Sequence, residues 1–265
     1  MVKVSCLCPT YNRLELLPEA IESFVRQSFP LAERELVILN DCWDQRLECE
    51  TPGVRVVNLR TRLESLGEKF NLLVELTRGD ILLPWEDDDI SLPGRIQQAV
   101  DLLPAGHKWT SQHSCENCGI GLAYQRYLGE PCPKQLGYWK PPQVWFMEGQ
   151  HLHWKHNVGV RHHASAFTRE AWRRVGGYPP ISGAQDAGMD QRLGGYLLPA
   201  FPDGIPPQAW QYIYRWGVTD HLSGHADLAS AWQAEADKWK KNGTFLIQPA
   251  WRQDYQALTQ SVLKI

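Results

Sequence analysis

The apolar residues in the first part of the chain follow two alternating spacings. Short apolar runs of the kind that forms buried strands cover residues 2–8, 35–40, 54–59 and 80–85. Between these runs, apolar side chains recur at the spacing of an α-helix in residues 14–25, 66–76 and 96–103. Strands that alternate with helices in this way predict an α/β fold built on a doubly wound, mostly parallel sheet.

The second part of the chain departs from this alternation. Residues 105–155 are rich in Cys, Pro, Gly and aromatic residues, and we interpret them as an irregular insert. After the insert we expect a strand over 160–167, helices over 168–175 and 185–193, a strand over 212–216, and a helical C-terminus over 226–265.

Polar loops follow three of the predicted strands, at residues 10–13, 41–44 and 86–89. The carboxyl ends of parallel strands meet at one edge of a sheet, so these loops can share one ligand. The third loop holds four consecutive acids, Glu86 to Asp89, directly after a buried strand. Neighbouring carboxylates repel each other, and a divalent cation with phosphate oxygens would neutralise them. The alternative is a solvated acidic turn at the start of the next helix.

Composition narrows the class of protein. The chain has 265 residues, a net charge of -3 and a pI near 6.3, which gives no basic face for nucleic acid. No apolar stretch reaches the roughly 18 residues that a membrane span requires. The first residues run directly into a strand pattern without a signal peptide, so we expect a cytoplasmic protein with reduced cysteines.

A second group of metal-binding residue types lies in the insert. Cys115 and Cys118 have the spacing of a zinc knuckle, and further ligands could come from Cys132, His113, His151, His153 and His156. The second half of such a site lacks paired spacing, so thiols without a metal are the alternative to a structural Zn²⁺.

Four ordered segments resemble the inverting family 2 glycosyltransferases of GT-A fold. They are residues 4–13 (VSCLCPTYNR), 39–41 (LND), 78–89 (RGDILLPWEDDD), and 175–178 (VGGY) followed by Gln185-Asp186. In order, they match the family's opening strand and loop, its nucleotide-binding acidic turn, its strand ending in a DxD motif, and its GG(F/Y)…ED segment. Each motif is weak alone, but the four in this order and spacing are specific, and the similarity covers about residues 2–195.

The resemblance implies a GT-A fold, with a Rossmann-like, mostly parallel central sheet flanked by helices and a mixed C-terminal half on the acceptor side. Within one domain, it implies a nucleotide-sugar-binding half over residues 1–104 and an acceptor-binding half over 105–265. The implied activity is metal-dependent inverting transfer of a sugar from a nucleotide-diphosphate sugar, preferably a UDP-sugar, to a hydroxyl of a saccharide or other acceptor. Mn²⁺ or Mg²⁺ would stabilise the leaving diphosphate.

The resemblance also assigns roles to individual residues. Asp186 is expected to be the general base, and Asp88 and His221 are expected to bind the metal. Nucleotide-sugar contacts are expected from Pro9, Tyr11, Arg13, Asp41, Lys69, Glu86 and Asp87. Among these contacts, Asp41 would receive the ring N–H of the base.

Each of these assignments has a structural alternative. Asp186 could be a first-turn acid favoured by the helix dipole, and Asp41 a plain turn residue. Arg13 and Lys69 could be ordinary surface charges. A single histidine such as His221 is more often a surface or core residue than a ligand.

Two neighbouring histidines lie close to the acceptor side of the implied site. His162 and His163 fall in the strand expected over 160–167. Side chains alternate across a strand, so only one of the two can face the site.

The sequence departs from the family pattern in several places. Cys42-Trp43 follows Asp41 where Gly-Ser is usual, Glu86 occupies the first DxD position, and Gln185 replaces the acid before the base. Base preference and the register of the DxD motif within 86–89 therefore stay open. Two other functions also remain. A nucleotidyltransferase of related α/β fold would need a Gly-rich basic loop that residues 9–13 lack, and a non-catalytic protein could bind a nucleotide or zinc.

Overall fold

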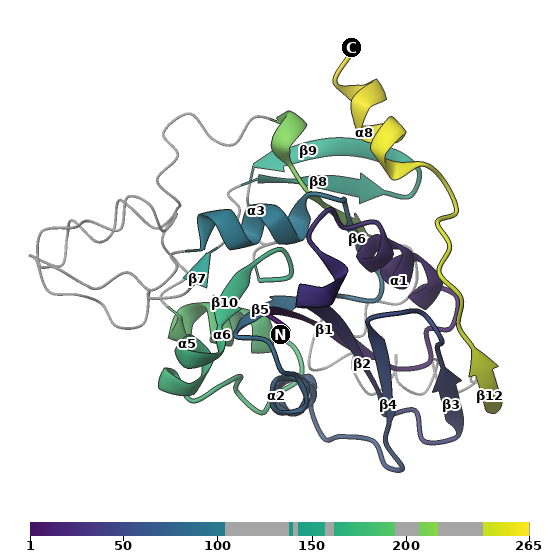
Figure 1. Cartoon of the computed structure of the whole chain (residues 1–265), viewed down its shortest axis with the longest axis vertical. Helices are drawn as coiled ribbons and strands as arrows, with labels where there is room; N and C mark the ends of the chain where they lie inside the picture. The colour runs from purple at the N-terminus through teal and green to yellow at the C-terminus, as the bar shows by residue number, and fades with distance from the viewer. Residues whose placement is uncertain (104–137, 140–142, 157–161, 194–206, 217–240, 265) are drawn as a thin grey trace, which may run out of the picture.

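The computed structural model describes residues 1–103, 138–139, 143–156, 162–193, 207–216 and 241–264. Its central sheet consists of β4 (Val54–Asn58), β2 (Arg34–Asn40), β1 (Val4–Thr10), β5 (Ile81–Pro84), β10 (Ala166–Thr168) and β7 (Tyr138–Trp139), in that order (Figure 1). The first four strands run parallel, whereas β10 is antiparallel to both of its neighbours. The mostly parallel sheet predicted from the sequence is therefore confirmed.

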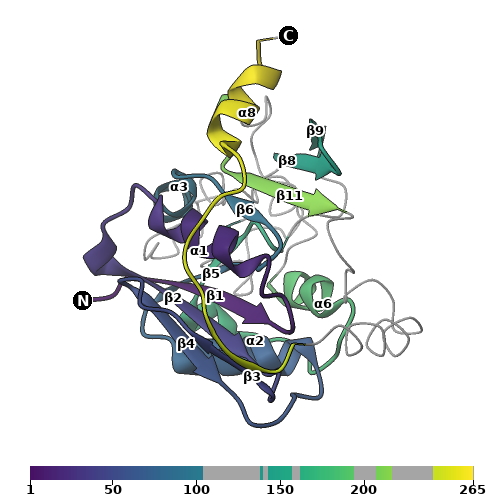
Figure 2. The same ribbon diagram turned by 90° about the vertical axis from the view of Figure 1, so that its right-hand side faces the viewer.

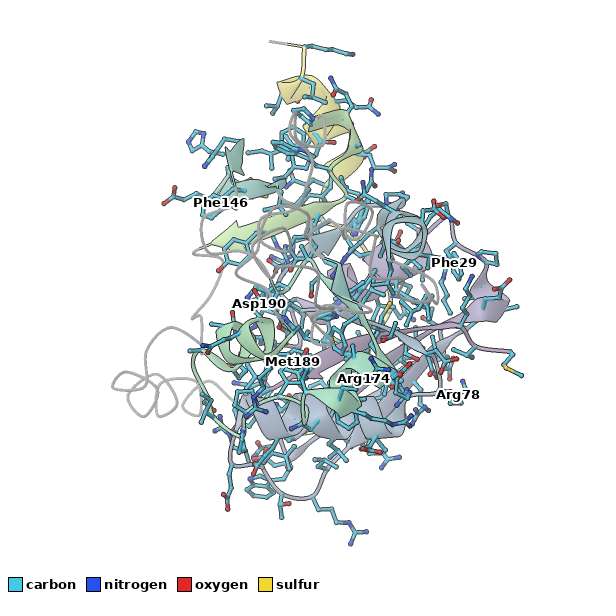
Figure 3. The ribbon with its side chains drawn as sticks, turned by 90° about the vertical axis from the view of Figure 1, so that its left-hand side faces the viewer. Phe29, Arg78, Phe146, Arg174, Met189 and Asp190 are labelled. Atoms are coloured by element: carbon cyan, nitrogen blue, oxygen red, sulfur yellow. The ribbon has the colours of Figure 1, made fainter. Side chains whose placement is uncertain are left out.

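Helices cover both faces of this sheet. One face packs on α1 (Leu17–Val25) and α3 (Arg95–Leu102), and the other on α2 (Leu66–Leu76), α5 (Arg169–Arg174) and α6 (Gln185–Arg192). Every residue of β1 is buried, because Cys6 and Cys8 face the first helix layer and Leu7 faces the second. Met189 anchors α6 in the second layer (Figure 3).

A second, smaller sheet is joined to the carboxyl edge of the first. It consists of β6 (Ile90–Ser91), β11 (Tyr212–Trp216), β8 (Gln143–Glu148) and β9 (His151–His156), in that order (Figure 2). β6 directly follows the acidic loop, so the loop connects the two sheets. A buried ion pair of 2.6 Å between Arg215 and Glu19 joins β11 of the second sheet to α1, and Tyr255 donates to the same carboxylate at 2.7 Å.

Some sequence-based expectations for the second half are wrong. The expected strand over 160–167 is reduced to β10, because His162–Ser165 form a turn in which Ser165 N donates to His162 O at 2.9 Å. The C-terminus is only partly helical, because β12 (Gly243–Leu246) pairs in parallel with β3 (Gln45–Glu48) before α8 (Tyr255–Val262) begins. Within the supposed irregular insert, residues 143–156 form the β8–β9 hairpin.

Two short 3₁₀ helices, η1 (Leu31–Glu33) and η5 (Pro207–Ala209), complete the described elements. Among all helices in the described ranges, none has the length and apolar character needed to span a bilayer.

Candidate active site

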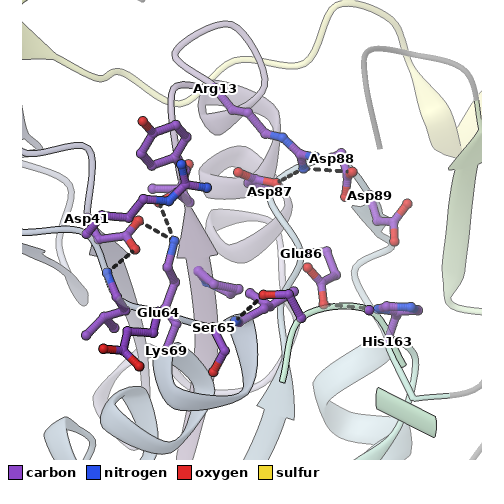
Figure 4. A pocket seen from close by; sticks show the side chains of 18 of the residues that line it. Arg13, Asp41, Glu64, Ser65, Lys69, Glu86, Asp87, Asp88, Asp89 and His163 are labelled. Atoms are coloured by element: carbon purple, nitrogen blue, oxygen red, sulfur yellow. Dashed lines mark hydrogen bonds and ion pairs between the residues drawn. The ribbon is translucent and has the colours of Figure 1, made fainter. Parts of the chain in front are cut away.

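A cavity of about 460 Å³ lies at the carboxyl ends of β1, β2 and β5, which are neighbours in the central sheet (Figure 4). Its lining contains most of the residues that the sequence singled out, namely Pro9, Tyr11, Arg13, Asp41, Lys69, Glu86, Asp87 and Asp88. The other lining residues are Thr10, Arg62, Leu63, Glu64, Ser65, Leu66, Asp89, His163, Ser182, Gly183 and Tyr214. The three polar loops therefore meet at one edge, as the strand order requires.

Arg13 joins the loop after β1 to the acidic loop after β5. Its Nη1 atom donates to Asp87 Oδ1 at 2.6 Å and to Asp88 Oδ2 at 2.8 Å. Just before it, Asn12 has a left-handed backbone with φ of 54°, and Gln45 Nε2 donates to its side chain at 2.8 Å. Burial alone would lower the pKa of Arg13, but the charges of Asp87 and Asp88 raise it. The guanidinium therefore stays charged and serves as counter-ion to the acidic loop.

The acids of this loop differ in their surroundings. Burial raises the pKa of Asp87 to about 6 against the opposing effect of Arg13, and only 2% of its side chain is exposed. The Asp88 side chain is 13% exposed and is the more accessible of the two from the cavity. In the part of the chain that the structure describes, no three His, Cys, Asp or Glu side chains are grouped so as to hold a metal ion by themselves.

Asp89 is turned toward the second sheet. Its Oδ2 accepts a hydrogen bond from the Tyr212 hydroxyl, and its Oδ1 accepts from Arg215 N at 2.8 Å. Burial raises the pKa of Asp89 to about 7. Its role is therefore to fasten the acidic loop to β11. No local pattern around Asp89 indicates this anchor, because its partners lie in a distant strand.

Lys69 and Asp41 form a buried ion pair at the other end of the cavity. Lys69 Nζ donates to Asp41 Oδ1 and, at 3.2 Å, to Thr10 O, while Leu63 N donates to Asp41 Oδ2 at 3.1 Å. Burial lowers the pKa of Lys69, and Asp41 opposes that shift. Ser65 is the N-cap of α2, and its hydroxyl accepts a hydrogen bond from the backbone N–H of Glu68 at 3.2 Å. This cap fixes the start of the helix that carries Lys69.

An aromatic ring lies beside this ion pair. The guanidinium carbon of Arg62 is 4.0 Å from the centroid of the Tyr11 ring, and Lys69 Nζ is 5.9 Å from it. Tyr11 and Arg62 both line the cavity. This end therefore combines their stacked planar groups with the Asp41 carboxylate and the Lys69 ammonium group.

Asp186 is linked to the cavity lining by a histidine that lies between it and Glu86. His163 Nδ1 lies 3.0 Å from Glu86 Oε1, and His163 Nε2 lies 3.4 Å from Asp186 Oδ2. Burial would raise the pKa of Asp186, but the hydrogen bond and charge of His163 hold it well below its usual range. Of the two histidines singled out in the sequence, His163 lines the cavity and His162 is buried beneath it. Only one of them therefore lines the site, as expected, but the reason is the turn that they form and not alternation along a strand.

The remaining candidate ligands are only partly described. His221 of the predicted metal site, and Cys115, Cys118, Cys132 and His113 of the predicted zinc site, lie outside the described residues. His151 is exposed on β9, and His153 stacks on Phe146 with ring centroids 5.1 Å apart. His156 is placed by its backbone at the end of β9.

Comparison with known proteins decides among the functions that the sequence left open. The family model for glycosyl transferase family 2 matches residues 5–175. This chain belongs to glycosyl transferase family 2. The family consists of sugar-transferring enzymes, so membership favours a glycosyltransferase over a nucleotidyltransferase or a non-catalytic binding protein.

Relatives of this family member share part of their length with it. Poly(ribitol-phosphate) β-N-acetylglucosaminyltransferase TarS of Staphylococcus aureus is 27% identical over 113 residues, which is 40% of this chain and 20% of TarS. The uncharacterized glycosyltransferase YwdF of Bacillus subtilis is 32% identical over 102 residues, 37% of either chain. The chain thus matches well under half the length of these relatives.

Solved structures show the same fold. The structure of S. aureus TarS residues 1–349 in complex with UDP-GlcNAc superposes with a TM-score of 0.52 at 14% identity, covering 84% of this chain and 61% of that one. At this identity the likeness shows the fold alone, and it confirms the GT-A fold that the sequence motifs implied.

Proposed function

We propose that this family member is a metal-dependent inverting glycosyltransferase that moves a sugar from a nucleoside diphosphate sugar, with a UDP-sugar as preferred donor, to an acceptor hydroxyl. The observation that carries the proposal is the order of groups along one cavity (Figure 4). Asp41 and Lys69 occupy one end, Arg13 and Asp88 the middle, and Asp186 approaches the other end through the His163 bridge. These groups suit a base, a diphosphate and an acceptor, in that order.

The first end of the cavity supports recognition of the nucleobase. A carboxylate oxygen has more than one lone pair, so Asp41 can accept a ring N–H in addition to its bonds from Lys69 and Leu63 N. Tyr11 and Arg62 offer a planar stack next to it. Uracil presents a ring N–H to an acceptor of this kind, which supports UDP as the nucleotide.

The acidic loop supports a divalent cation. Its donors are hard carboxylate oxygens, which Mn²⁺ and Mg²⁺ both accept. Among the described residues, Asp88 and the neighbouring Asp87 are available as ligands, and no third protein ligand accompanies them. Two carboxylates are enough for Mg²⁺, which is commonly held by one or two carboxylates plus substrate phosphates. When bound, the cation would neutralise charge on the leaving diphosphate. Arg13, already at 2.8 Å from Asp88, would add its charge to the same end of the donor.

Asp186 is the general base in this proposal. Its carboxylate takes the proton of the acceptor hydroxyl as that oxygen forms a bond to the anomeric carbon. The bond between the anomeric carbon and the diphosphate oxygen breaks on the opposite side, so the configuration inverts. The lowered pKa of Asp186 keeps the carboxylate ionised at neutral pH, the form that a base requires, while the contact with His163 lowers its affinity for a proton.

An assay of nucleoside diphosphate release tests the proposal. The protein is incubated with UDP-, GDP- and dTDP-sugars, with Mn²⁺ or with EDTA, and water or added saccharides serve as acceptors. We expect UDP release that requires Mn²⁺. Pyrophosphate release from a nucleoside triphosphate would instead support a nucleotidyltransferase, and nucleotide binding without any turnover would support a non-catalytic protein.

A further inference from the structure

His163 connects the acidic loop of the donor side to the proposed base. Its Nδ1 atom lies 3.0 Å from Glu86 Oε1, and its Nε2 atom lies 3.4 Å from Asp186 Oδ2. The histidine side chain is 17% exposed and lines the cavity together with Glu86, so this half of the bridge forms part of the cavity wall (Figure 4). Glu86 follows β5, whereas Asp186 lies in the first turn of α6, so the contact joins two distant parts of the fold.

The chemistry of the ring decides how this bridge works. A neutral imidazole has one donor nitrogen and one acceptor nitrogen, and an acceptor nitrogen would repel a carboxylate oxygen. Both ring nitrogens of His163 face carboxylate oxygens. A protonated ring donates from both nitrogens, and such charge-assisted bonds are the strong ones. The arrangement is therefore an imidazolium held between two carboxylates.

The start of α6 gives Asp186 little support of its own. The N-cap residue is Ala184, which has a left-handed backbone with φ of 62° and makes no side-chain capping bond. Gly183 before it also has a positive φ, of 71°. Beyond a backbone hydrogen bond from Ala187, the Asp186 side chain is held from outside the helix by His163.

His163 is itself held in place from two sides. Arg95 Nη2 donates to its backbone carbonyl at 2.6 Å. Its ring stacks on Tyr214 of β11, with centroids 6.0 Å apart and an interplanar angle of 29°. The ring therefore has a fixed position from which to orient a partner.

The preceding histidine strengthens this connection to α6. His162 Nδ1 lies 3.1 Å from Asp190 Oδ1, and His162 Nε2 lies 2.6 Å from the Tyr178 hydroxyl (Figure 3 shows Asp190 on α6). Asp190 is four residues after Asp186, so both acids lie on one face of the helix. Adjacent histidines thus contact adjacent turns of α6.

We propose that His163 is a positioning residue of the transfer reaction: it holds Oδ2 of Asp186 so that Oδ1 faces the acceptor hydroxyl, and it sets the distance between this base and the donor loop. The inference rests on the proposed role of Asp186 as the base. It goes further in assigning a residue that contacts neither the nucleotide nor the cation in the scheme above.

Two amide variants test the contact of His163 with Glu86 and its contact with Asp186 one at a time. Asn places its amide nitrogen near the position of Nδ1, which serves Glu86, whereas Gln places it near the position of Nε2, which serves Asp186. His163→Asn and His163→Gln differ by one methylene and are each other's matched control. The rate and KM for UDP-GlcNAc turnover are measured with Mn²⁺, and the dissociation constant of UDP is measured by calorimetry.

We expect His163→Asn to lower kcat by about tenfold to a hundredfold, because a base displaced by about 1 Å loses rate on this order. His163→Gln should retain several times more of the rate than His163→Asn. KM for UDP-GlcNAc and the UDP dissociation constant should change by less than about threefold in both. Full kcat in both variants, or loss of UDP binding in step with loss of rate, would overturn the positioning role.

Two further measurements keep this result distinct from a failure of the proposed function. Asp186→Asn is assayed in parallel: if it stays active, the proposed base is wrong, whereas an inactive Asp186→Asn beside fully active His163 variants refutes the positioning role alone. Nitrogen-15 NMR of labelled histidine needs no substrate. We expect His163 to be protonated on both nitrogens at neutral pH in the wild type, and a neutral ring would contradict the bridge.

Discussion

Arg13 Nη1 lies 2.6 Å from Asp87 Oδ1 and 2.8 Å from Asp88 Oδ2, so one cationic nitrogen bridges the two acids at which a metal is expected. Adjacent ionised carboxylates repel each other, and Arg13 supplies the positive charge that offsets this repulsion. A cation that enters the cavity shares these carboxylates with Arg13. The stability of the acidic loop and its response to metal are therefore linked through this residue.

Replacing Arg13 should make the protein depend on metal for stability. In Arg13→Gln, Asp87 and Asp88 lose their counter-ion, and we expect unfolding in EDTA to be easier by about 3–5 kcal/mol. Mn²⁺ should restore part of this loss and should stabilise the variant more than the wild type. Thermal unfolding with EDTA or Mn²⁺ measures both effects.

Arg46→Gln is the matched control for this experiment. Arg46 pairs with Glu48 at the surface, where its side chain is 67% exposed, so the change should alter stability by less than about 0.5 kcal/mol. Equal stability of Arg13→Gln and wild type in EDTA would show that Arg13 is not the counter-ion of the loop.

Loss of the base should affect turnover and spare nucleotide binding. Asp186→Asn keeps the shape of the side chain but cannot take a proton, so we expect UDP release to fall by about 10²- to 10⁴-fold. The UDP dissociation constant should stay within about threefold of wild type. Glu170→Gln makes the same chemical change at a side chain of α5 that is 69% exposed, and it should have wild-type rates. A parallel loss of UDP binding in Asp186→Asn would point to a structural role instead.

Replacement of His163 should shift the low-pH side of the plot of kcat against pH to higher pH. In the wild type, burial would raise the pKa of Asp186, but His163 lowers it, so the base stays ionised as the pH falls. In His163→Asn, whose amide serves Glu86 and not Asp186, Asp186 loses both the charge and the hydrogen bond of His163, so its pKa rises. Because a protonated Asp186 could not act as the proposed base, the acid limb of kcat in His163→Asn should shift to higher pH, and by more than in His163→Gln. Profiles from about pH 4 to 8 check this, and an unchanged limb contradicts it.

The buried pair of Lys69 and Asp41 should show strong coupling. Their side chains are 8% and 2% exposed, so Lys69→Met leaves a buried carboxylate without its cation. We expect a loss of about 3–5 kcal/mol and a fall in Tm of roughly 10 °C. The double variant with Asp41→Asn should be more stable than the sum of the single losses predicts. Additive losses would show that the pair does not interact as described.

Much of the first half of the chain and of its share of the cavity could be predicted from the sequence. The strand pattern of β1 and the regular alternation with helices predicted a parallel sheet, and a parallel sheet brings Arg13, Asp41 and Asp88 to one edge. Short-range patterns are sufficient here because each loop directly follows its strand. The start of α2 at Leu66 was likewise readable from the apolar spacing.

The second half could not be predicted to the same degree, because its contacts join residues far apart in the chain. Nothing near Glu19 indicates that it pairs with Arg215, and nothing near Asp89 indicates Tyr212. The segment Gly243–Leu246 forms a strand because β3 offers it hydrogen-bonding partners, and such pairing overrides the weak local preference of a short segment. The bridge through His163 belongs to the same class, since it depends on a turn that was expected to be a strand.

The proposed function requires that the cavity bind a nucleoside diphosphate together with a cation held at Asp88. Calorimetric titration of UDP into the protein, with Mn²⁺ and with EDTA, tests it most directly, and Asp88→Asn is titrated beside the wild type. We expect binding of UDP in Mn²⁺ that weakens by about tenfold or more in EDTA or in Asp88→Asn. Absence of binding by UDP, GDP and dTDP under all conditions, or UDP binding that is indifferent to both metal and Asp88, would refute a metal–diphosphate site in this cavity.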